Sequence, residues 1–176
     1  MSRRARARMQ HPRRVAVNTM EIAASRARKL SRSDIDQQVA LVRLAVAEFC
    51  RGQHCAQHWR SLADTANMAE TLAGMRMGAG DAVDELVGNT QQALHDVFER
   101  QASSGIWTLF ADEIDALLWL APLHQAQLEA CSYGEFETAY DRTMRRLAQA
   151  LAGNAAPGTI VVVGDMPAAA TAGAAA

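Results

Sequence analysis

Apolar residues recur every three or four positions along most of the chain, which is the spacing of one face of an α-helix. The clearest series consists of Ile35, Val39, Val42, Val46 and Phe49. Four more stretches repeat the period, at about residues 54–77, 81–104, 108–130 and 132–153. A short basic helix is also expected from Thr19 or Met20 to Leu30. The pattern predicts an all-α fold, a bundle of four to five helices within residues 20–153.

Two of these stretches begin with side chains that favour helix starts. Ser33 with Asp36 is an approximate capping box before the first apolar series. Ser132 with Glu135 is a good capping box before the last one. A helix is therefore expected to begin at each serine.

The inner faces of the five stretches define a predicted core. Its members are Val39, Val42, Val46, Leu62, Leu72, Leu94, Val97, Ile114, Leu117, Leu128, Phe136, Tyr140 and Leu147.

The 108–130 stretch is apolar on a second side as well, at Trp119, Leu120 and Leu123. A helix with two apolar sides lies either at the centre of a bundle or in an oligomer interface. We therefore expect a homo-oligomer, with these three residues as interface candidates. Pro122 in the same stretch is expected to kink or split the helix.

The two ends of the chain differ in character from the bundle. Residues 1–19 combine high charge with Pro12, so we expect a disordered basic arm. Residues 154–176 form an alanine-rich tail that is expected to be disordered apart from a short β-prone segment at 159–163. That segment lies along the bundle, pairs between subunits or binds by strand addition.

Composition narrows the class of protein. About one residue in five is alanine and aromatic residues are 5%, which argues against an all-β fold. No apolar run is long enough for a membrane span, and no secretory signal is evident. The three cysteines are an odd number, which is not a disulfide framework. We expect a cytoplasmic protein that does not enter membranes.

The formal net charge of −1 conceals a strong asymmetry. Residues 1–32 carry ten basic and one acidic side chain, whereas residues 33–176 carry eight basic and eighteen acidic ones. The arm is a candidate for binding nucleic acid, because arginines that neutralise phosphates release counterions. The alternative is a disordered tail with no such role. The candidate arginines are Arg3, Arg4, Arg6, Arg8, Arg13 and Arg14.

Three patterns could carry chemistry or base recognition, and each has a plainer structural explanation. Cys50, His54, Cys55 and His58 have zinc-ligand residue types, but Gly52 interrupts the helical spacing between them. Residues 62–76 resemble a degenerate helix-turn-helix, yet an uninterrupted amphipathic helix explains the same pattern.

The third pattern is the His95–Asp96 doublet, which resembles that of all-helical HD-type metal phosphohydrolases. His58 with Asp112 or Asp141 would complete the ligand set of such a hydrolase. The glycine and lysine that usually follow the doublet are absent here. We therefore expect no metal site, no cofactor and no enzymatic activity, and we interpret His124 as a hydrogen-bonded core histidine.

The segment Trp107–Leu117, followed by Leu123–His124, Gln127–Leu128 and Gly134–Glu135, resembles small uncharacterised proteins from phage and mobile-element regions of proteobacteria. The resemblance covers roughly residues 55–165, and some of those proteins are labelled as regulators. It implies a bacterial or phage setting and an accessory role. We expect a non-enzymatic accessory or regulatory protein that acts through protein contacts. The alternatives are a DNA-associated regulator and a metal-dependent phosphohydrolase.

Overall fold

The computed structural model describes residues 19–53, 55–78 and 81–153. The basic arm, the alanine-rich tail with its 159–163 segment, and His54 lie outside the described residues. The part described is all-helical, as the apolar period predicts, and contains no strand. Its helices are α1 (Thr19–Ala27), α2 (Arg32–Cys50), α3 (Ala56–Gly74), α4 (Asp81–Ser104), α5 (Ala111–Ala130) and α6 (Tyr133–Leu151). The expected four to five helices thus become six within these residues.

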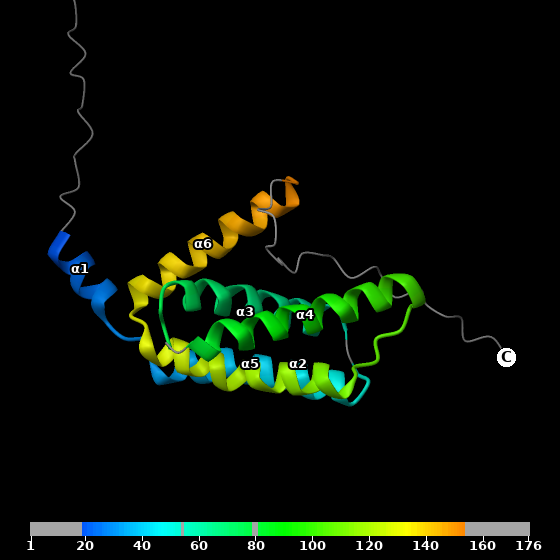
Figure 1. Cartoon of the computed structure of the whole chain (residues 1–176). Helices are drawn as coiled ribbons and strands as arrows, with labels where there is room; N and C mark the ends of the chain where they lie inside the picture. Colours follow the sequence, from blue (N-terminus) through cyan, green and yellow to red (C-terminus); the bar gives the residue numbers. More distant parts are fainter. Residues whose placement is uncertain (1–18, 54, 79–80, 154–176) are drawn as a thin grey trace, which may run out of the picture.

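Helices α2 to α5 form a four-helix bundle (Figure 1). Each packs against its two neighbours, and α3 also contacts α5 across the centre. Helices α2 and α5 are antiparallel, because Arg32 near the start of α2 pairs with Glu129 near the end of α5, at 2.9 Å. Short connections between successive helices favour this arrangement.

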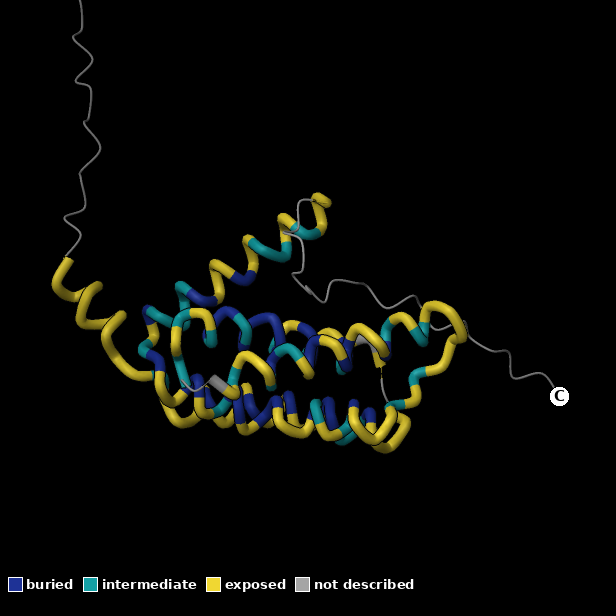
Figure 2. The backbone as a smooth tube through the Cα atoms, in the orientation of Figure 1, coloured by how far each residue is buried: buried dark blue, intermediate teal, exposed yellow. Residues whose placement is uncertain are grey.

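The core runs along the inside of the bundle (Figure 2). Trp59 is its largest fully buried side chain, and its ring lies 5.4 Å from that of Phe98. Nine of the thirteen predicted core residues are buried. The other four are the half-buried Ile114, Phe136 and Leu147 and the exposed Tyr140.

The helix starts follow the expected chemistry with one correction. α2 is capped by Ser31, whose Oγ accepts from the backbone N–H of Asp34, and not by Ser33. Ser132 caps α6 as predicted, and Glu135 completes the capping box. Pro122 lies inside α5 but does not split it.

Helices α1 and α6 lie outside the bundle (Figure 1). α6 packs on α3, and α1 packs on the start of α6. The predicted inner stripe of α6 is therefore only partly covered, which is why Tyr140 is exposed and Phe136 and Leu147 are half-buried. No helix in the described part of the chain is long and apolar enough to cross a membrane.

Candidate functional site

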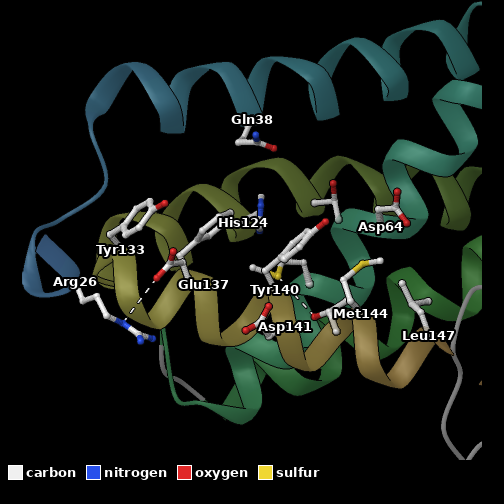
Figure 3. A pocket seen from close by; sticks show the side chains of 14 residues that line it. Arg26, Gln38, Asp64, His124, Tyr133, Glu137, Tyr140, Asp141, Met144 and Leu147 are labelled. Atoms are coloured by element: carbon white, nitrogen blue, oxygen red, sulfur yellow. Dashed lines mark hydrogen bonds and ion pairs between the residues drawn. The ribbon is translucent and has the colours of Figure 1, made fainter. Parts of the chain in front are cut away.

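An open groove of about 800 Å³ lies between α6 and the neighbouring faces of α2 and α3 (Figure 3). We call it the α6 groove. Its lining residues come from five helices and are Arg26, Gln38, Asp64, Thr65, Met68, His124, Tyr133, Phe136, Glu137, Tyr140, Asp141, Thr143, Met144 and Leu147.

Apolar side chains of α6 make one wall of the groove. Tyr140 is 53% exposed and Met144 is 46% exposed. Phe136 and Leu147 continue the same stripe, because residues three and four positions apart share one face of a helix. The stripe extends from Phe136 to Leu147, about three turns or roughly 16 Å. Large apolar side chains left in contact with water along one continuous stripe mark an interaction surface.

The start of α6 is held firmly against α1. Arg26 donates to the carbonyl oxygen of Gly134 and to Oγ1 of Thr138, both at 3.4 Å, and its Nε lies 3.7 Å from a Glu137 oxygen. A Cβ at position 134 would lie 2.8 Å from Cβ of Arg26, so only glycine permits this close approach.

The middle of α6 is fixed to α3 by a buried contact. The hydroxyls of Thr71 and Thr143 lie 2.7 Å apart. Thr143 also hydrogen-bonds to the carbonyl oxygen of Ala139 one turn earlier. The wall of the groove is therefore anchored at its start and at its centre.

His124 of α5 lies at the floor of the groove and is 4% exposed. Burial lowers its pKa to about 4, because a low-dielectric site disfavours the charged imidazolium, while the Gln127 side chain opposes the shift weakly. Neither Nδ1 of His124 nor Oε1 of Gln127 has a hydrogen-bond partner with normal geometry. The imidazole is thus neutral at pH 7. The expected core location is confirmed, but Nδ1 lacks the expected hydrogen bond.

Three carboxylates border the apolar lining. They are Asp64 on α3 and Glu137 and Asp141 on α6. Partial burial raises the pKa of Asp64, and the charge of Arg60 opposes that shift. Glu137 forms an ion pair with Arg26, whereas Asp141 forms none within the described residues. The groove therefore combines an apolar interior with an acidic rim.

The opposite flank of α6 is basic. Arg142, Arg145 and Arg146 line a second cleft of about 600 Å³ between α6, α3 and α4. Arg146 pairs with Glu70 of α3. Arg142 and Arg145 have no ion pair within the described part of the chain. The charges of α6 are thus separated along its length, with acidic residues in the first half and basic residues in the second.

The interface candidates on α5 divide between surface and core. Trp119 is 57% exposed, next to the equally exposed Leu118, whereas Leu120 and Leu123 are buried in the bundle. The second apolar side of α5 therefore serves mostly as core, because α5 packs against α2, α3 and α4. On this helix, Trp119 and Leu118 are accessible to a partner, whereas Leu120 and Leu123 are not.

The metal-ligand candidates that the structure describes do not converge. Cys50 and Cys55 are exposed, His58 is half-buried and His95 is exposed on α4. Among the described residues, no group of three or more His, Cys, Asp or Glu side chains is arranged to hold a metal ion.

A cleft between α4 and α5 does bring together Asp96 and Asp112 from the phosphohydrolase pattern. Asp96 accepts a hydrogen bond from Gln92 there, at 2.7 Å. Asp141 lies elsewhere, in the α6 groove.

The helix-turn-helix interpretation of residues 62–76 is wrong. α3 is continuous from Ala56 to Gly74, so no turn occurs near Asn67. Asn67 and Met68 are buried helical residues in the bundle. The uninterrupted amphipathic helix is the correct interpretation.

The groove does not follow from the sequence pattern, because the spacing of the α6 stripe predicts a core position for it. A usable signal is nevertheless present, since the segment 133–151 separates its apolar residues from its polar ones more sharply than the other helices do. No protein-family model, curated protein or solved structure matches the chain, so the resemblance to phage and mobile-element proteins remains a prediction.

Proposed function

We propose that this chain is a non-enzymatic accessory or regulatory protein that acts through protein contacts, and that the α6 groove is its docking surface. The observation that carries the proposal is the exposure of Tyr140 and Met144 along a groove whose α6 wall is anchored at its start and its centre. A bacterial or phage setting, as the sequence resemblance implies, suits such an accessory role.

The groove favours an amphipathic helix as partner. A helix that enters such a groove presents apolar anchors at positions i, i+3 or i+4, and i+7, and the stripe from Phe136 to Leu147 is long enough to accept these. The aromatic ring and flexible thioether of Tyr140 and Met144 are side chains that adapt well to a partner.

The acidic rim selects the charge of that helix. Asp64, Glu137 and Asp141 border the groove, and Arg26 is the one cation among its lining residues. A partner with arginine or lysine beside its apolar stripe gains attraction at the rim, whereas an acidic partner is repelled. The partner chemistry is therefore an amphipathic helix with a basic flank.

The proposal is tested with two designed helical peptides that share one apolar stripe and differ in carrying arginine or glutamate on the flank. Fluorescence anisotropy measures binding of each labelled peptide to the purified full chain. We expect the basic peptide to bind at least about tenfold more tightly, which corresponds to about 1.4 kcal/mol. Tyr140→Ser with Met144→Ser should weaken binding by a similar factor or more.

A matched control keeps the test specific. Leu44 on α2 is 51% exposed and is not among the groove residues. Leu44→Ser should leave peptide affinity unchanged. Binding that is absent for both peptides, or that persists in the double variant, would refute the groove as a docking surface.

The alternative function as a DNA-associated regulator rests on the charge asymmetry of the chain. The arm carries six arginines, and residues 33–176 are strongly acidic. If the arm binds DNA, the affinity should fall steeply as the salt concentration rises and should be lost when residues 1–14 are deleted. A deletion that leaves DNA affinity unchanged would show that the arm is not the DNA-binding element.

A further inference from the structure

We propose that the basic arm of this chain, residues 1–18, binds in the α6 groove and competes there with basic-flanked partners. This inference rests on the proposed function, because it concerns the regulation of the same groove. The arm lies outside the described residues. Its charge, its point of attachment and the chemistry of the groove assign it to this place.

The charge of the arm is complementary to that of the groove. Residues 1–18 hold six arginines and no aspartate or glutamate. The groove is bordered by Asp64, Glu137 and Asp141, with Arg26 as the one cation among its lining residues. A cationic segment is therefore attracted to the groove by the same force that selects a basic partner.

Arg26 shows how the groove binds an arginine from this end of the chain. Its guanidinium donates to the carbonyl oxygen of Gly134 and to Thr138, and it pairs with Glu137. Asp141 is the next acid along α6, one turn after Glu137 on the same side of the helix. It is exposed and forms no ion pair within the described residues. The rim thus offers a further carboxylate to an arginine of the arm.

The arm is attached close enough to reach the whole groove. It joins α1 at Thr19, and α1 packs on the start of α6, where the groove begins. α1 has nine residues and is therefore roughly 13 Å long. An extended segment of 18 residues spans up to about 60 Å, whereas α1 and the apolar stripe together measure roughly 30 Å.

The arm also carries a few apolar side chains that suit the interior of the groove. They are Met9, Val15 and Val17. Methionine is flexible and fills irregular apolar surfaces such as the one beside Tyr140 and Met144. An amphipathic helix carries a longer apolar stripe than the arm does. It therefore binds more tightly than the arm and displaces it.

Attachment to the same chain compensates for these weak contacts. A tethered segment meets its site at an effective concentration on the order of millimolar, so even a low-affinity segment occupies the site for much of the time. A partner then binds only the fraction of chains whose groove is free, and its apparent affinity falls by that fraction. The arm thus raises the affinity that a partner needs.

Removing charge from the arm tests this competition. Arg13→Gln with Arg14→Gln should raise the affinity for the arginine-flanked peptide by about two- to threefold at low salt, because the arm then competes less well. Arg142→Gln with Arg145→Gln is the matched control, since it removes the same charge from the opposite flank of α6. Equal affinities of the two double variants would show an effect of overall charge and would overturn the inference.

Paramagnetic broadening in NMR spectra locates the arm directly. The nitroxide label is attached at Met9→Cys, close to the middle of the arm. The exposed Cys50 and Cys55 are first replaced by serine, while the buried Cys131 is kept. The label then reports which surface of the folded chain the arm contacts.

The broadening should be confined to the groove. The backbone signals of Tyr140 and Asp141 should be broadened, whereas those of Trp119, an exposed residue outside the groove, should not. The effect should disappear at about 1 M salt, where the screening length is about 3 Å. Broadening that is absent at Tyr140 and Asp141, or that is equal over the whole surface, would overturn the inference.

Neutralising the acidic rim should release the arm. Asp64→Asn with Asp141→Asn should abolish the broadening at Tyr140. Glu85→Gln with Asp115→Asn is the matched control, because both are exposed acids outside the groove and the charge change is the same. Broadening that survives the loss of both rim aspartates would contradict the charge complementarity on which the inference depends.

A mixed sample distinguishes the chain's own arm from that of a second copy. Spin-labelled chains without isotope are mixed with isotope-labelled chains that carry no spin label. We expect no broadening at Tyr140 in this mixture. Broadening there as strong as within one chain would show that the arm binds another copy, and it would overturn the intramolecular contact.

The two proposals fail separately. A chain that binds the basic peptide equally well with and without the arm's arginines refutes the arm as a competitor and leaves the docking surface standing. A chain whose arm broadens the groove signals, but which binds neither peptide, refutes the docking surface and leaves the arm in the groove. Circular dichroism of each variant confirms that its helices are retained.

Discussion

Arg100 and Glu113 join α4 to the first turn of α5 through a two-pronged ion pair. Arg100 Nη1 lies 3.2 Å from Oε2 of Glu113, and Nη2 contacts Oε1. The guanidinium also donates to the carbonyl oxygen of Thr108 and lies 4.1 Å above the ring of Phe110. Glu113 in turn accepts from the backbone N–H of Phe110 at 2.7 Å. One buried carboxylate thus fixes both the loop and the start of the helix.

Glu113→Ala should destabilise the fold by about 3 kcal/mol, because it leaves the Arg100 charge half-buried and removes the helix-start acceptor. Urea denaturation measures this loss. Asp112→Ala, at an exposed position in the same turn, should change stability by less than about 0.5 kcal/mol. Equal effects of the two substitutions would contradict the role assigned to the pair.

Gly78 and Gly52 offer a matched pair of glycines. Both have φ near +70°, at 71° and 72°, so alanine at either position is strained by about 1 kcal/mol. A Cβ at Gly52 meets nothing within 4 Å, but one at Gly78 lies 3.0 Å from Cγ of the buried Gln127.

Gln127 cannot move away freely, because it donates to the carbonyl oxygen of Ala69 at 2.9 Å. Gly78→Ala should therefore cost about 2–3 kcal/mol in total, against about 1 kcal/mol for Gly52→Ala. Thermal unfolding of the two variants measures the difference. Identical melting temperatures would show that Gln127 does not restrict position 78.

His124 should make stability depend on pH. Its pKa is about 4 in the folded protein and near 6.5 when unfolded, so between these values the unfolded chain binds one more proton. Stability is full above pH 6.5 and falls as the pH drops toward 4, by about 3 kcal/mol for this group. Asp64 has the opposite effect on stability, because its pKa is raised in the folded protein. Around the pH at which this carboxyl titrates, its contribution to stability rises as the pH falls.

Urea denaturation at pH 7 and pH 4.5 compares the wild type with His124→Gln. The variant lacks the titrating group, so its free energy of unfolding should differ much less between the two pH values than that of the wild type. A variant that keeps the full pH dependence would show that other groups cause it.

The helices were predictable from sequence to within a few residues, since the periodic apolar positions and the Ser132–Glu135 capping box act locally. α4 begins and ends as the apolar pattern at about residues 81–104 predicted, at Asp81 and Ser104. The start of α2 was misplaced because Ser31 and Ser33 are equally good caps, and only the chain path selects Ser31.

The candidate site was not predictable in the same way. Tyr140 was expected in the core because its spacing is identical to that of buried stripes. Conversely, Leu120 and Leu123 were expected at an interface, although α5 is central enough to bury both.

The sequence by itself determined where the chain is helical and which face of each helix is apolar, because backbone propensity and side-chain spacing are properties of neighbouring residues. Only the tertiary structure decided which apolar faces are covered. Coverage depends on how many helices surround each one, and α6 packs closely on α3 alone within the bundle whereas α5 meets three neighbours. That difference leaves the groove open beside α6 and closes the second apolar side of α5.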